Sequence, residues 1–115
     1  MDPSAVRSLP AAALRDAPRL DCLQETTDLV PLTWRLAARS SDGRTLVFLV
    51  NLGEQKVEKV VGARVAETAA SVSVIIYGKL YGSTMDHAAH SLIGQFMVDL
   101  ESPIGGRGVS GSPEK

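Results

Sequence analysis

Residues 53–70, GEQKVEKVVGARVAETAA, decide which fold class the sequence predicts, because they lie between two segments rich in strand-forming residues. Their apolar side chains recur at the spacing that places them on one face of a helix: Val57, Val60, Val61 and Val65, with Ala69 near that face. The charged residues lie mainly elsewhere around the helix. The stretch therefore predicts an amphipathic helix, which tertiary packing must hold because valine and glycine lower intrinsic helicity.

The segment before this helix predicts a β-hairpin. Residues 31–39, PLTWRLAAR, alternate between one face suited to the core and one wetter face. Residues 45–52, TLVFLVNL, are almost continuously apolar, which is typical of a central strand covered on both sides.

The turn between the two strands sets their register. A two-residue loop at Asp42 and Gly43 pairs Leu36 with Leu49, whereas a three-residue loop with Gly43 in the left-handed region pairs Leu36 with Phe48. We favour the second register, because it places the larger apolar side chains beside one another.

The segment after residue 70 predicts a strand and then a second helix. Residues 71–82, SVSVIIYGKLYG, alternate as a strand does, with Val72, Val74 and Ile76 on one side. From Met85 to Leu100 the apolar residues follow a 3, 1, 3, 1 spacing over four turns, which is the strongest helical pattern in the chain.

Together these elements predict a single α+β domain, with a mainly antiparallel sheet flanked by two helices. The length of 115 residues suits one core. Residues 1–19 are expected to be disordered or to form a short helix, and residues 20–102 to form the domain. Residues 103–115, rich in Gly, Ser and Pro, are expected to be a disordered tail.

Composition argues against several classes of function. Twelve Lys plus Arg against 13 Asp plus Glu give a net charge of −1, without the basic excess that nucleic-acid binding usually needs. No apolar stretch approaches the roughly 20 residues of a membrane span, and the N-terminus does not resemble a signal peptide. The lone Cys22 cannot form an internal disulfide, which favours a reducing compartment, the cytoplasm or also the nucleus.

Both histidines lie in residues 83–92, STMDHAAHSL, together with Asp86 and Ser91. A capped helix start already accounts for Asp86, whose carboxylate meets the unpaired amides and the positive end of the dipole. His87 and His90 are too few for a zinc site without a third ligand, and no Gly-x-Ser-x-Gly elbow accompanies the serine. We therefore expect no catalytic residues, no metal and no cofactor, and we keep as the alternative a small hydrolase or metal-dependent enzyme centred on residues 86–90.

Exposed residues beside the second predicted helix are the candidates for contact with a partner. They lie at a strand end or away from the apolar stripe: Tyr77, Lys79, Tyr81, His87 and His90. Tyrosines with an apolar body and a polar tip suit a protein interface. We expect a non-enzymatic protein-binding factor.

The order of elements resembles that of the small proteasome assembly chaperones, most closely their fourth member. The resemblance covers about Leu20 to Glu101, and its matching points are Leu52-Gly53 and the Leu80 and Gly82 that precede Ser83. It implies a chaperone that forms a heterodimer with a related small chaperone and holds proteasome α subunits while their ring assembles. The chain departs from that pattern after Pro103, where no further strand is predicted.

Overall fold

The computed structural model describes residues 7–9, 18–53, 55–80 and 93–111. These residues form eight β-strands and contain no helix. The strands in chain order are β1 (Arg7–Leu9), β2 (Val30–Leu32), β3 (Arg35–Ser40), β4 (Thr45–Asn51), β5 (Val57–Glu67), β6 (Ser71–Leu80), β7 (Ile93–Asp99) and β8 (Gly108–Gly111). The predicted α+β fold with two flanking helices is therefore wrong. Within these residues no helix is long and apolar enough to cross a membrane.

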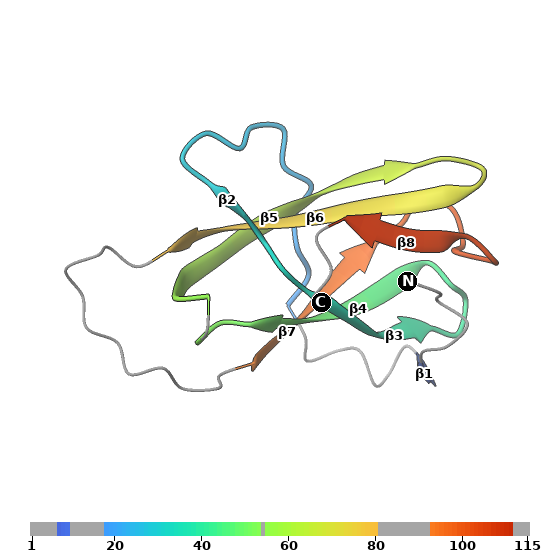
Figure 1. Ribbon diagram of the computed structural model, residues 1–115. Coiled ribbons are helices and arrows are strands. Elements are labelled where there is room, and N and C mark those ends of the chain that lie inside the picture. The colour runs from blue at the N-terminus through green and yellow to red at the C-terminus, as the bar shows by residue number, and fades with distance from the viewer. Residues whose placement is uncertain (1–6, 10–17, 54, 81–92, 112–115) are drawn as a thin grey trace.

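The strands form two sheets that pack on each other, as Figure 1 shows. Sheet A has the strand order β1-β3-β4-β7, and sheet B has the order β2-β6-β5. Strand β8 also pairs with β6, so that β2 and β8 follow each other along the same edge of β6. The pairs β1–β3 and β6–β8 are parallel and the others are antiparallel.

The predicted β3–β4 hairpin and its register at Leu36 are confirmed. Leu36 lies opposite Phe48, and Gly43 adopts a φ of 74° in the turn. The turn has four residues, 41–44, and not three. A β-bulge between Leu36 and Ala38 takes up the extra residue, which restores the predicted pairing.

Strand β5 occupies the stretch for which helical spacing predicted a helix. Two register shifts against β6, between Val57 and Lys59 and between Val60 and Gly62, each insert one residue into the alternation. Val57 and Val60, three residues apart, therefore both pack on the core, as two residues of one helical face would. Once the bulges are allowed for, the valines follow their ordinary preference for strands.

Strand β7 likewise replaces part of the second predicted helix. Val98 and Leu100 pack on the main core, whereas the intervening face presents Met97 to a second buried cluster with Val47. Because both faces of β7 are covered there, its apolar residues do not alternate, and their spacing resembles that of a helix. The remainder of that prediction, residues 85–92, lies outside the described residues.

Trp34 marks the place where the chain passes from sheet B into sheet A. Its side chain is fully buried, its indole N–H donates to the carbonyl of Val74 at 3.1 Å, and its ring meets Phe48 edge-on at 4.7 Å. One residue thus contacts β4 of sheet A and β6 of sheet B. Apart from Trp34 and Phe48, the buried side chains of the core between the sheets are aliphatic.

Residues 103–111 differ from the predicted disordered tail. Ile104 is buried, and Val109 of β8 is buried opposite Val72 of β6. β8 supplies the further strand that the sequence did not predict after Pro103. Similarly, β1 lies within the N-terminal segment that was expected to be disordered or helical.

Candidate functional site

One side of the sandwich lies between two edge strands, β7 of sheet A and β5 of sheet B. Residues 18–23 run along part of this side and pair with both strands. Met97 donates to the carbonyl of Pro18 and accepts from the amide of Leu20 at 2.9 and 2.8 Å. Ala63 then donates to Asp21 and accepts from Leu23, at 2.9 and 2.8 Å. Residues 18–23 thus join the edges of the two sheets.

A groove opens where this segment leaves the two strands. It has a volume of about 260 Å³, and we call it the β5–β7 groove. Its apolar floor is formed by Leu20, Ala63, Val65 and Val98, and its rim by Cys22 and the acidic residues Asp21, Glu67, Asp99 and Glu101. This volume is below the roughly 300–1,000 Å³ of typical small-molecule sites, so the groove suits a single side chain better than a whole free ligand.

The edge of β5 presents backbone hydrogen-bonding groups to the groove. The Thr68 amide donates a hydrogen bond to the carbonyl of Ser71 across the β5–β6 turn. Hydrogen-bonded pairs alternate along an antiparallel ladder, so the even-numbered residues of β5 near this turn also direct their N–H and C=O groups toward β6. Odd-numbered residues direct theirs outward, as the bonds of Ala63 to residues 21 and 23 confirm. The N–H and C=O of Val65 therefore point outward beside the groove, and no other described residue bonds to them.

The edge of β7 offers the same groups across the groove. Met97 bonds outward to residues 18 and 20, and Asp99, two residues further, therefore directs its N–H and C=O to the same side. Two unpaired strand edges thus face one small groove. Such edges are templates for the addition of another strand.

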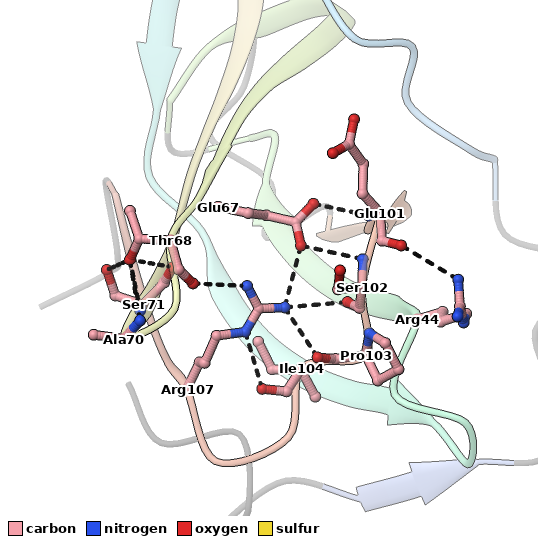
Figure 2. Close-up of polar contacts among 10 residues, drawn as sticks. All are labelled: Arg44, Glu67, Thr68, Ala70, Ser71, Glu101, Ser102, Pro103, Ile104 and Arg107. Carbon is pink, nitrogen blue, oxygen red and sulfur yellow. Dashed lines mark hydrogen bonds and ion pairs between the residues drawn. The ribbon is translucent and has the colours of Figure 1, made fainter.

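Glu67, which lines the groove, forms an ion pair with Arg107, and Figure 2 shows the polar contacts of this pair. The Arg107 guanidinium lies 3.1 Å from Glu67, and the two side chains are only 13% and 15% exposed. The guanidinium also donates to four backbone carbonyls, those of Thr68, Ser102, Pro103 and Ile104. It therefore holds the loop after β7 against the β5–β6 turn.

The carboxylate of Glu67 accepts three hydrogen bonds in the same network. It accepts from the amides of Glu101 and Ser102, at 2.8 and 3.3 Å, and from Arg107. Burial by itself raises the pKa of the Glu67 carboxyl, but these three donors outweigh burial, so that its pKa lies below the ordinary value of 4.5. Glu67 is thus an anion that positions the groove and has little capacity for a ligand.

A second hollow of about 400 Å³ lies on the other side of Glu67 and includes Arg107. Each of the three nitrogens of that guanidinium already donates to a protein acceptor. Arg107 is the only cationic side chain among the described residues of this hollow, and its hydrogen bonds commit it to the protein. We therefore place the candidate site in the β5–β7 groove.

The four carboxylates of the groove are not equivalent. Asp99 accepts from Thr45 at 2.8 Å and pairs with Arg19, and Glu67 pairs with Arg107. The side chains of Asp21 and Glu101 are exposed and have no partner among the described residues. Figure 2 shows the Glu101 carboxylate directed away from Glu67, while its backbone is held by Glu67 and Arg44.

The groove does not contain the residues that the sequence predicted for partner contact. Tyr77 and Lys79 share the outer face of sheet B, where Tyr77 is half-buried and Lys79 lies exposed opposite Lys59. Tyr81, His87 and His90 lie outside the described residues, as do Asp86 and Ser91 of the alternative enzyme site. Among the residues that are described, no group of three or more His, Cys, Asp or Glu side chains is arranged to hold a metal ion.

Sequence reasoning did not identify the groove, because no local pattern contains it. Asp21, Val65 and Asp99 come from three distant segments, and the pair Glu67–Arg107 spans 40 residues. Comparison with known proteins finds no family model, no curated protein and no solved structure that matches the chain. Function is therefore inferred from the geometry of the groove.

Proposed function

We propose that the protein is a non-enzymatic protein-binding module that holds an extended segment of a partner chain in the β5–β7 groove. The observation that supports this proposal is the pair of outward-facing N–H and C=O groups of Val65 beside a groove large enough for one side chain. A partner segment adds to β5 as a further strand, and every second side chain of that segment points to the same face of the strand as the Val65 side chain.

Residues 18–23 provide a precedent within the molecule for this mode of binding. They already form a short strand-like contact with Ala63 of β5, through its amide and carbonyl. The partner segment continues that contact at Val65, where residues 18–23 no longer cover the edge. Each added backbone hydrogen bond contributes about 1 kcal/mol net, so a short segment is held weakly and reversibly.

The finer expectation, a chaperone of proteasome α subunits in a heterodimer, stays a prediction. It drew on helices within residues 53–70 and 85–100, where the structure has the strands β5 and β7. The proposal made here keeps its general content, a protein partner and no cofactor. Contact through Tyr77 and Lys79 on sheet B, and localisation in the cytoplasm, likewise stay predictions.

The experiment that tests the proposal is a selection of peptides displayed on phage, carried out against the full chain and against Val65→Pro. Of the backbone hydrogen-bonding groups, the substitution removes only an N–H that points out of the sheet, so the β5–β6 ladder keeps its hydrogen bonds. Val65→Thr keeps the N–H and the β-branched shape and is the matched control. We expect enriched peptides to bind the parent chain and Val65→Thr, and to lose at least tenfold in affinity for Val65→Pro. Equal binding to all three folded proteins would exclude strand addition at this edge.

A further inference from the structure

The chemistry of the groove limits what a bound segment presents to it. Four carboxylates line the groove and two of them, those of Asp99 and Glu67, are neutralised by arginines from outside it. Asp21 and Glu101 remain without a partner among the described residues, and no cationic side chain lines the groove. The rim therefore carries about two uncompensated negative charges at neutral pH.

The floor of the groove has the opposite character. Val65 and Ala63 of β5 and Val98 of β7 form it, together with Leu20. A side chain that fits both parts must be apolar along its length and positively charged at its tip. Lysine and arginine have this build, because they bury an aliphatic stem while the charged head stays at the polar rim.

The register of an added strand places one such side chain in the groove. The residue of the segment that lies beside Val65 directs its side chain to the same face as Val65, whose own side chain lines the groove. Its two neighbours point to the opposite face. One residue of the segment thus places its side chain in the groove. The groove volume of about 260 Å³ is suited to a single long side chain.

We infer that the segment bound in the β5–β7 groove is basic, with a lysine or arginine beside Val65 whose charged head lies between Asp21 and Glu101. This inference rests on the proposed strand addition and names the chemistry of the partner. Contacts with exposed carboxylates are individually weak and salt-dependent, so they select among segments and do not hold one by themselves.

The test uses four acetylated and amidated heptapeptides of alternating threonine and valine, in which the central residue is lysine, arginine, glutamine or glutamate. Valines at the second and sixth positions share the face of the central residue. Each peptide is titrated into the full chain at low salt, and binding is followed through the backbone amide resonances of Val65 and Asp99. We expect the lysine and arginine peptides to bind about fivefold more tightly than the glutamine peptide, and the glutamate peptide to bind least.

Two double variants locate the charge that selects the peptide. Asp21→Asn with Glu101→Gln should abolish the preference for lysine over glutamine. Glu25→Gln with Glu58→Gln makes the same change in net charge at exposed carboxylates that do not line the groove, and should leave the preference unchanged.

The outcomes separate the inference from the proposed function. If all four peptides bind equally, or if both double variants lose the preference alike, the inference is wrong while strand addition stands. If no peptide shifts the Val65 and Asp99 resonances, strand addition itself fails and the inference fails with it.

Discussion

The contact between Arg107 and Glu67 gives the most direct test of how this sandwich is held together. Arg107→Met keeps much of the apolar stem of the side chain, while it removes the guanidinium and with it one ion pair and four hydrogen bonds to carbonyls. The variant should be much less stable than the parent, because the loop after β7 loses most of its attachment to the β5–β6 turn.

The size of the effect follows from the burial of the pair. Breaking a buried pair costs about 3–5 kcal/mol, and the two side chains are 13% and 15% exposed. Glu67 keeps two backbone donors in the variant, which places the expected loss at the lower end, about 3 kcal/mol. For a chain of 115 residues this lowers Tm by about 12 °C, since the entropy of unfolding is roughly 2.1 cal/mol/K per residue.

The measurement is equilibrium unfolding in urea together with a thermal scan. Arg107→Lys, which keeps the charge but not the planar fork, should recover no more than about 1 kcal/mol. Arg64→Met removes an exposed arginine from β5 and serves as the control, with an expected change within about 0.5 kcal/mol. A double-mutant cycle with Glu67→Gln should give a coupling energy of about 1–3 kcal/mol. A loss below 1 kcal/mol for Arg107→Met, with an unchanged slope in urea, would refute the assigned role.

Two further predictions concern the same side of the molecule. Because the pKa of Glu67 is lowered in the folded state, its contribution to stability is complete above the ordinary value of 4.5 and is lost as the pH falls through the folded pKa. The stability difference between the parent and Glu67→Gln, measured by urea unfolding, should therefore shrink below pH 4.5; a difference that grows on acidification would contradict this. In Gly62→Ala the new methyl would lie 2.7 Å from the carbonyl oxygen of Asp21 and from the side chain of Leu23. Residues 18–23 should then move off β5, and the Ala63 amide should exchange faster with solvent, whereas Gly106→Ala, which meets nothing within 4 Å, should leave it unchanged. Unaltered protection of Ala63 in Gly62→Ala would show that the strand accommodates the methyl.

The acidic side chains of the β5–β7 groove are also of the kind that limits pairing between the edges of different chains. Exposed edges are templates for pairing with other chains, and charged residues at an edge limit such pairing. Acidic side chains from Asp21, Asp99 and Glu101 surround the unpaired groups of Val65. In the proposed mode of binding, the same charges select a basic segment and disfavour the edges of other acidic chains.

The sequence by itself determined the elements whose hydrogen-bonding partners lie close along the chain. The β3–β4 hairpin, with Gly43 in the left-handed region and Leu36 opposite Phe48, follows from alternation and turn chemistry. Strand β6, with Val72, Val74 and Ile76 buried, follows from alternation alone.

Only the tertiary structure decided between strand and helix at β5 and β7, and it alone created the groove. Two bulges in β5 and burial of both faces of β7 produce a helix-like spacing of apolar residues. The spacing of apolar residues alone cannot distinguish such strands from an amphipathic helix, because the bulges and the burial of both faces depend on the neighbouring strands. The groove forms where segments around Leu20, Val65 and Asp99 meet. The packing of the two sheets brings these distant strand edges together, and no local pattern in the chain predicts it.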